Sequence, residues 1–216
     1  MKVRKPFAHA DPFLTVAVNE LIRDYKCHTI VLYGSRARGD ATAKSDYDIM
    51  GVRKSGDKFR FAERRNGKYL DVFIYPEKSL LKIGEEHLYM RHAKVLFQHA
   101  EFGTRFLRKM QVALKKPYKP LPIDELRVRR IWPYKMLERI EVGDLEAKYR
   151  RSWLHEALLY DYFNLRKKRF WGSKEGFAWL KQHDLKTYKL FSQVLEKPAN
   201  LRLLRKLVDR VTAVRL

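Results

Sequence analysis

Two aspartates separated by a single residue, Asp46 and Asp48, end the segment VLYGSRARGDATAKSDYDIMG at residues 31–51. On a β-strand such residues point to the same face of the sheet, with Cα atoms about 6.5–7 Å apart. Their carboxylates would repel each other there unless a cation lay between them. Oxygen ligands suit a hard divalent ion such as magnesium, so the pair predicts a metal site.

A third acid, Asp71, lies in the middle of the apolar segment KYLDVFIYP at residues 68–76. The alternation of a strand would turn Leu70 and Val72 to one face and Asp71 to the other. A third carboxylate from a neighbouring strand would strengthen the metal site. A buried salt bridge to one of the many arginines is the structural alternative.

A candidate phosphate site precedes the two adjacent acids. The run HTIVLYG at residues 28–34 predicts a buried strand that ends at Gly34, because glycine allows a tight turn. The backbone amides that open the following helix, with the Ser35 hydroxyl, would hold a phosphate group. Arg36 and Arg38 follow and would add charge-assisted hydrogen bonds to phosphate oxygens.

The motif LYGSRARGDATAKSDYDI, followed by Asp71, resembles the signature of the nucleotidyltransferase superfamily, which includes polymerase beta and the antibiotic nucleotidyltransferases. In that signature Gly-Ser is followed about ten residues later by two acids separated by one apolar residue. Tyr47 stands where an aliphatic residue is usual. The resemblance covers roughly residues 28–75. It implies transfer of a nucleoside monophosphate from a nucleoside triphosphate to an acceptor, with release of pyrophosphate.

The resemblance also implies roles for the acids and the turn. Asp46 and Asp48 would hold two magnesium ions, and Asp71 would bind the ion that activates the acceptor oxygen. Two metals would then stabilise both the attacking and the leaving oxygen of an in-line displacement. The candidate nucleotide-binding residues are Gly34, Ser35, Arg36, Arg38 and Ser45.

The general base is open between two residues. Asp71 is one candidate. Glu156, in WLHEALLYDY on a predicted helix of the C-terminal half, is the other, because acids in this half act so in some relatives. A solvated helix face is the structural alternative for Glu156. The seven histidines of the chain show no metal-ligand spacing.

The elements around these residues predict an α+β domain. Asp11 followed by Pro12 predicts a helix over 11–26. Residues 46–54 and 68–76 predict two strands joined by a hairpin with Asn66-Gly67 at its turn. With the strand over 28–34, a further strand over 93–98 and a helix over 101–115, they form a mixed sheet flanked by helices.

The second half of the chain predicts a helical bundle. KKPYKPLP, residues 115–122, holds three prolines and three lysines and is typical of an exposed connection. We therefore expect a catalytic domain over 1–118 and an acceptor-binding domain over 119–216. Helices are expected over 124–141, from Asp144 to near Gly172, from Ser173, from Asp184 and after Asn200. The second of these carries apolar and aromatic residues at helical spacing: Leu145, Tyr149, Trp153, Ala157, Tyr160 and Leu165.

The net charge of +22, from 47 Lys plus Arg against 25 Asp plus Glu, favours a polyanionic partner. In the C-terminal half, RVRRIW, YRRSW and NLRKKRFW interleave basic with aromatic residues, which favours RNA, including a transfer RNA end, as the acceptor. The alternative is that the aromatic residues form the bundle core and the basic residues its solvated faces.

An antibiotic or other small-molecule acceptor also stays open, although a polycationic aminoglycoside would be repelled. A third interpretation is a nucleotide-binding module of a toxin–antitoxin pair, against which the three retained acids argue.

The single cysteine, Cys27, excludes an internal disulfide and a cysteine-rich metal site. No run of eighteen uncharged apolar residues occurs, and the first twenty residues lack the apolar core of a signal peptide. We therefore expect a cytoplasmic protein with no membrane partner. Its oligomeric state stays open.

Overall fold

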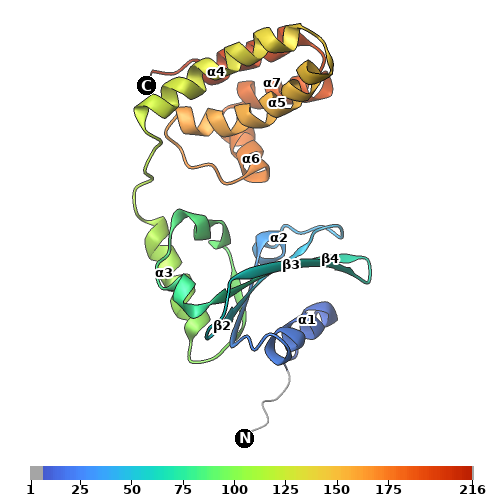
Figure 1. Ribbon diagram of the computed structural model, residues 1–216, viewed down its shortest axis with the longest axis vertical. Helices are drawn as coiled ribbons and strands as arrows, with labels where there is room; N and C mark the ends of the chain where they lie inside the picture. Colours follow the sequence, from blue (N-terminus) through green and yellow to red (C-terminus); the bar gives the residue numbers. More distant parts are fainter. Residues whose placement is uncertain (1–6, 216) are drawn as a thin grey trace, which may run out of the picture. The chain divides into compact units, whose positions relative to one another are not determined.

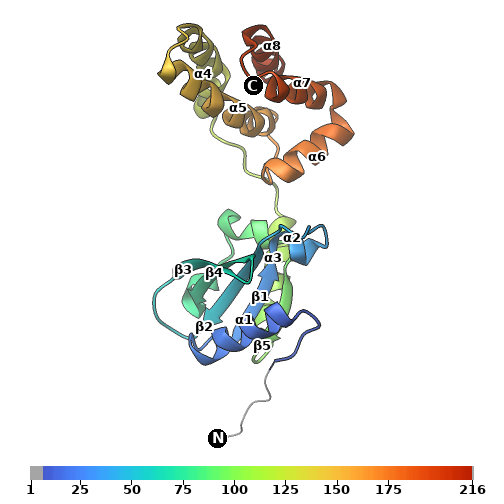
Figure 2. The same ribbon diagram turned by 90° about the vertical axis from the view of Figure 1, so that its right-hand side faces the viewer.

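The computed structural model describes residues 7–215 and divides the chain between Pro117 and Tyr118 into two compact units. Figures 1 and 2 show the sheet-containing N-terminal unit in blue to green and the helical C-terminal unit in yellow to red. The division lies within the proline-rich connection, one residue before the expected boundary at 118.

A five-stranded mixed sheet with the order β3-β4-β2-β1-β5 forms the centre of the N-terminal unit. Neighbours β2 and β4 are parallel, and the other three pairs are antiparallel. The strands are β1 (Thr29–Tyr33), β2 (Tyr47–Arg53), β3 (Phe59–Arg65), β4 (Lys68–Pro76) and β5 (Lys94–Gln98).

Helices cover both faces of this sheet (Figure 1). The first face packs against α1 (Pro12–Arg23), whose N-cap Asp11 accepts a hydrogen bond from the Phe13 amide as predicted. The second face packs against α3 (Phe102–Leu114), where Gly103 comes close to Thr29 and Val95. The remaining short helices are α2 (Gly34–Arg38) and the 3-10 segments η1 (Glu77–Leu80) and η2 (Glu85–Met90). The α+β fold is as predicted.

The predicted hairpin between residues 46–54 and 68–76 is wrong, because strand β3 lies between them. The turn at Asn66-Gly67 joins β3 to β4, with φ angles of 51° and 74° as a type I′ turn requires. Strand β3 lies at the sheet edge and alternates half-buried with exposed residues, so it has no buried apolar run to mark it. Its presence makes β2 and β4 parallel neighbours, which places their acids in register.

The only cysteine, Cys27, is buried in the core of the N-terminal unit. Its thiol fills space beside Gly51 on β2, where a Cβ atom would be 2.7 Å from the Cys27 Sγ atom. Burial raises the pKa of the thiol to about 12. The thiol is therefore a packing group that stays protonated at neutral pH.

Within residues 118–215, five helices form the C-terminal unit, which is the helical bundle that the sequence predicted. They are α4 (Ile123–Glu141), α5 (Leu145–Leu165), α6 (Ser173–His183), α7 (Leu185–Glu196) and α8 (Leu201–Thr212). Two predicted N-caps are confirmed, because Asp144 and Asp184 each accept a hydrogen bond from the amide three residues later. Asn200, at the predicted start of α8, makes the same kind of bond. Ser173 is instead the first residue of α6, whose N-cap is Gly172. In the part of the chain that the structure describes, no helix is long and apolar enough to cross a bilayer.

The predicted extent of α5 is wrong, and most of the apolar residues predicted on its face are exposed, although Leu165 is buried. The helix ends at Leu165, well before Gly172, and Leu145, Tyr149 and Trp153 are 83%, 74% and 51% exposed. Tyr160 is exposed as well. The buried residues lie toward the other side and the C-terminal half, where α4 and α8 pack: Leu154, Leu158, Leu159, Tyr162, Phe163 and Leu165. Apolar residues occur all around this helix, so their spacing does not identify the buried face.

A buried ion pair joins α4 to α5. Arg129 donates to the fully buried Asp161 at 2.8 Å and to Glu125 at 2.9 Å. Burial raises the pKa of Asp161, and the Arg129 guanidinium opposes this effect. Removing one partner of a buried pair leaves an uncompensated charge, so this contact restrains how α4 and α5 pack.

We expect Arg129→Ala to lower the free energy of unfolding of the C-terminal unit by about 3–5 kcal/mol at neutral pH. The loss should shrink in acid, because Asp161 then takes up a proton and no longer needs a partner. All four tryptophans lie in this unit, so urea unfolding followed by tryptophan fluorescence measures it. Arg127→Ala is the control, because the Arg127–Asp124 pair is exposed and is worth at most about 1 kcal/mol. Equal losses in the two variants would contradict the buried-pair argument.

Candidate active site

Asp48 and Asp71 lie side by side in the N-terminal unit. Asp48 on β2 is in register with Asp71 on the parallel strand β4, and strands of one sheet are about 4.8 Å apart. Their neighbours in sequence, Ile49 and Val72, are buried against α1. The alternation of a strand therefore places both carboxylates on the opposite face. This is the pairing of Asp48 with a third acid that the sequence predicted.

The sequence predicted that Asp46 and Asp48 lie on the same strand, and this is wrong for Asp46. It precedes β2 by one residue and is exposed, and its backbone carbonyl accepts a hydrogen bond from Arg36 at 3.1 Å. Its charge still raises the pKa of Asp48. Across residues 7–215, no three Asp, Glu, His or Cys side chains are grouped closely enough to hold a metal ion as they stand.

Gly34 brings the turn after β1 into contact with Asp48. Its φ angle is +69°, a conformation that other residues adopt only with strain. A Cβ atom at this position would be 2.0 Å from the Asp48 Oδ2 atom. Glycine is therefore required at this position for two reasons: the positive φ angle, and the lack of space for a side chain beside the Asp48 carboxylate. The predicted turn thus lies directly beside one of the predicted acids.

The other predicted nucleotide-binding residues take different positions around this turn. The Ser35 side chain is half-buried, and its hydroxyl makes no hydrogen bond to another described residue. Arg38 pairs with Asp40 at 3.3 Å and is close enough to lower the pKa of Asp48. Ser35 and Arg38 are therefore the two side chains placed to meet a ligand here.

Arg36 and Ser45 instead stabilise the loop that carries Asp46. Arg36 donates to the Ser45 carbonyl at 2.7 Å, and its guanidinium lies 3.7 Å from the centre of the Tyr47 ring. The Ser45 hydroxyl accepts a hydrogen bond from the Thr42 amide at 2.9 Å. Both side chains thus hold the backbone of this loop in place, and few of their hydrogen-bonding groups remain to bind a phosphate.

Arg60 is a site residue that the sequence analysis missed. It projects from β3 and donates two hydrogen bonds to the Asp71 carboxylate, at 2.8 and 2.7 Å. Once β3 is known, the turn at Asn66-Gly67 sets the hairpin register that places Arg60 across from Phe73, diagonal to Asp71. The salt bridge considered as an alternative for Asp71 is thus present, together with the neighbouring acid.

The surroundings of Asp48 disfavour its ionised form. Burial raises the pKa of this carboxyl, and repulsion from Asp71 and Asp46 raises it further, while Arg38 and Arg60 oppose the shift. Ionised Asp48 is therefore held at an energetic disadvantage that a nearby cation would relieve.

Tyrosines border the two acids. Tyr33, which is in register with Asp48 on β1, packs edge-on against Tyr89 with ring centres 5.3 Å apart. Burial raises the pKa of Tyr33, and the charges of Asp48 and Asp71 add to the effect. These hydroxyls stay protonated at neutral pH and are available as hydrogen-bond donors.

Glu156 belongs to the C-terminal unit. It is exposed on α5 and lies at a cavity of about 610 Å³ whose other walls are mostly aromatic and aliphatic side chains from α5, α6 and α7. Its neighbour His155 lines the same cavity, and burial with the charge of Arg151 lowers the pKa of this imidazole. The cavity is a candidate site for a small, largely apolar molecule.

Comparison with known proteins assigns a class to the N-terminal unit. Residues 16–90, from α1 to η2, match the nucleotidyltransferase domain family. This range contains the Gly34 turn, Asp46, Asp48 and Asp71. This range therefore forms a nucleotidyltransferase domain, which the helical C-terminal unit follows in the chain.

A solved structure with the same class in its name is similar over most of the chain. It is a nucleotidyltransferase-like protein from Exiguobacterium sibiricum 255-15, with 14% sequence identity and a TM-score of 0.41. The alignment covers 91% of this chain and 73% of that one. Among curated proteins, none matches the sequence.

We expect Gly34→Ala to be more damaging than Gly39→Ala. Both residues have positive φ angles, so each change costs about 1 kcal/mol from backbone strain. Only at Gly34 does the new methyl group meet the Asp48 carboxylate, because nothing lies within 4 Å of a Cβ at Gly39. Thermal unfolding followed by circular dichroism measures the difference. Equal stability of the two variants would show that Asp48 does not occupy this space.

Asp48→Asn should stabilise the metal-free protein at pH 7. The pKa of Asp48 is higher in the folded than in the unfolded chain, so its ionised form weakens the fold. The gain should shrink as the pH falls from about 7 to about 4, because wild-type Asp48 then becomes neutral. Circular dichroism melts across this range test the prediction, with Asp57→Asn, in the exposed turn after β2, as the control. A variant less stable than wild type at pH 7 would contradict it.

Proposed function

We propose that the N-terminal unit transfers a nucleoside monophosphate from a nucleoside triphosphate to an acceptor hydroxyl, with magnesium as the cofactor. The acceptor oxygen forms a bond to the α-phosphorus, the bond to the β-phosphate bridging oxygen breaks, and pyrophosphate leaves. The observation that carries the proposal is the placement of Asp48 beside both Asp71 and the Gly34 turn. Acids and turn thus meet on one face of the sheet.

The donor set fits a divalent metal. All candidate ligands are carboxylates, and the raised pKa of Asp48 reflects a local excess of negative charge. Nucleotidyltransferase domains generally use divalent metal ions. Asp46, Asp48 and Asp71 would hold two magnesium ions, which supply stabilisation of the attacking and leaving oxygens when bound. Arg60 now neutralises Asp71, so it would have to release this carboxylate to a metal.

The chain's own groups would position the triphosphate and accept the proton. The Gly34 amide and the Ser35 hydroxyl would bind phosphate oxygens, and Arg38 would add positive charge. Arg36 and Ser45 would hold the loop that presents Asp46. Asp71 would accept the proton of the acceptor hydroxyl, with Glu156 as the alternative base for an acceptor bound by the C-terminal unit.

RNA, including a transfer RNA end, is the acceptor that we favour, because a net charge of +22 attracts a polyanion. The second candidate is a small-molecule acceptor of the antibiotic type, supported by the apolar cavity at Glu156. A nucleotide-binding module of a toxin–antitoxin pair, without turnover, is the remaining alternative.

The test is a transfer assay with each of the four nucleoside triphosphates labelled at the α-phosphate. Magnesium is supplied with total RNA, protein or antibiotic pools. Label should appear on RNA, and Asp48→Asn or Asp71→Asn should reduce it by on the order of 100-fold or more, the scale for losing one charge-stabilising group. Asp57→Asn, an exposed aspartate outside the site, should keep full activity.

The outcomes separate the three interpretations. Label on small molecules or protein alone would replace RNA as the acceptor. Pyrophosphate release that is absent in wild type, or unchanged in both Asp variants, would end the proposal of transfer at this site.

A further inference from the structure

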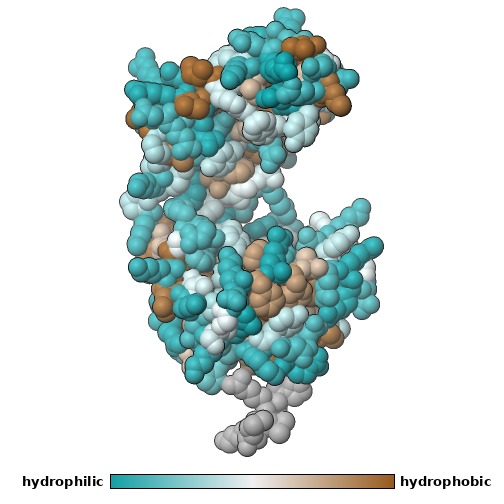
Figure 3. Space-filling model, in the orientation of Figure 1, coloured by the Kyte–Doolittle hydropathy of each residue, from teal (hydrophilic) through white to brown (hydrophobic). Residues whose placement is uncertain are grey.

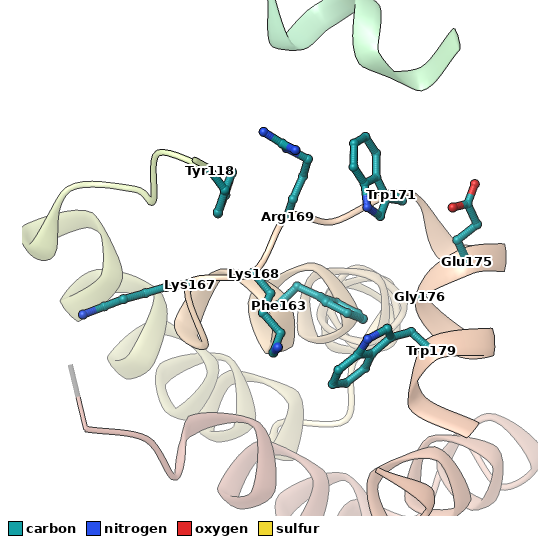
Figure 4. A pocket seen from close by; sticks show the side chains of 9 residues that line it. All are labelled: Tyr118, Phe163, Lys167, Lys168, Arg169, Trp171, Glu175, Gly176 and Trp179. Atoms are coloured by element: carbon teal, nitrogen blue, oxygen red, sulfur yellow. The ribbon is translucent and has the colours of Figure 1, made fainter. Parts of the chain in front are cut away.

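A second cavity of the C-terminal unit, of about 370 Å³, lies where α5 ends and α6 begins (Figure 4). Four of its lining side chains are aromatic: Tyr118, Phe163, Trp171 and Trp179. Three consecutive basic residues, 167–169, also line it, against one acid, Glu175. Figure 3 shows that the face of the molecule in view is mainly hydrophilic, with separate hydrophobic patches.

The backbone between the two helices places the basic residues at this cavity. The Lys168 amide donates to the Phe163 carbonyl and the Lys167 amide to the Asn164 carbonyl, both at 2.8 Å, which is the Schellman pattern of a helix end. Lys167 has a φ angle of +54°, where glycine is usual. A lysine here costs about 1 kcal/mol relative to glycine. Folding alone would therefore favour glycine at this position.

The side chain of Lys167 also makes no contribution to holding the described part of the fold together. Within residues 7–215, its exposed side chain makes no ion pair and no hydrogen bond. Its neighbour Arg166 does have such a role, since it donates to the Val211 carbonyl at 2.9 Å and ties the loop to α8. The positive charge of Lys167 is thus free to meet a ligand.

Each of the other basic runs of this unit has at least one arginine paired with a carboxylate. Arg127, Arg129, Arg150 and Arg205 each bond an Asp or Glu side chain. The aromatic residues of these runs are likewise engaged, as in the perpendicular pair of Trp132 and Trp153 with ring centres 5.1 Å apart. At residues 163–179, by contrast, aromatic and basic side chains line one cavity together.

The chemistry of this cavity matches an unpaired base with its phosphates. Lys168 lies 5.0 Å from the centre of the Trp179 ring, and Arg169 lies 5.1 Å from that of Trp171. Such cation–π contacts are worth about 0.5–1 kcal/mol at exposed sites. Stacking of a base on an aromatic side chain is worth about 1–3 kcal/mol. A base can therefore displace the cations from the rings, and the cations can then contact the adjacent phosphates.

We infer that this cavity binds one unpaired base of a single-stranded nucleic acid, stacked on Trp171 or Trp179, while Lys167 and Lys168 contact the flanking phosphates. Binding itself needs neither nucleoside triphosphate nor magnesium. The further statement that such a strand is the acceptor rests on the proposed nucleotidyl transfer.

The test is the fluorescence anisotropy of a labelled oligouridine of about ten nucleotides, titrated with the full-length protein at several salt concentrations. Lys167→Gly should weaken binding several-fold and reduce the slope of log K against log salt by about 0.7, the value for one phosphate contact on a single strand. The same variant should keep or raise the melting temperature, because glycine removes the strain at φ +54°. Lys206→Ala, an exposed lysine on α8 outside the cavity, is the charge-matched control and should keep the affinity.

A tryptophan pair tests the stacking. Trp171→Ala should weaken binding by on the order of tenfold. Trp153→Ala removes an exposed tryptophan of α5 outside the cavity and should not weaken binding.

An oligothymidine of equal length tests whether the bound strand is RNA or DNA. Tighter binding of oligouridine supports RNA, and equal binding supports recognition of base and phosphate alone.

Three results would overturn the inference. Equal weakening in Lys167→Gly and Lys206→Ala would show that binding reflects net charge. Uridine monophosphate bound as tightly as the oligomer would make the cavity a mononucleotide site. Duplex RNA bound as tightly as the single strand would exclude a stacked base. Because Asp48→Asn should keep the affinity for the oligomer, failure of transfer and failure of binding are distinguishable.

Discussion

The N-terminal unit depends on the close approach of the Asp48 carboxylate to Gly34. That contact exists because β1 and β2 pair with Tyr33 opposite Asp48, so the turn after β1 comes to lie against the acid. The parallel pairing of β2 with β4 then adds Asp71 to the same face. Backbone hydrogen bonding, rather than any attraction between the acids, therefore assembles a cluster whose charges repel.

The sequence allowed prediction of those parts of this site that depend on local signals. Strand β1 ended just before Gly34, the acids of β2 and β4 came to one face, and Asp11, Asp144 and Asp184 capped their helices. Strand β3 was missed because an edge strand pairs on one side only and needs no buried run. Missing it hid Arg60, whose role depends on hairpin register. Asp46 lay outside its expected strand because the loop held by Arg36 ends just before β2.

The C-terminal unit shows what periodicity and composition leave undecided. The apolar residues of α5 surround the helix, so only the positions of α4 and α8 determine that Leu154 and Leu158 are buried and Tyr149 is exposed. Two of the ion pairs join residues that are remote in sequence. Arg129 meets Asp161 and Arg205 meets Glu141, at separations of 32 and 64 residues. These remote pairs contribute to deciding which basic residues are left for a polyanion, and no local pattern in the sequence reveals them.

The buried position of Cys27 has a practical consequence for work on this enzyme. Because its thiol is packed beside Gly51 and held protonated, maleimide reagents should not attack the natural chain under native conditions. A cysteine introduced on the surface would then be the single reactive thiol of the molecule. Fluorophores, spin labels or crosslinkers could be attached at one chosen position without first removing the native residue, and the packing of the core would remain intact.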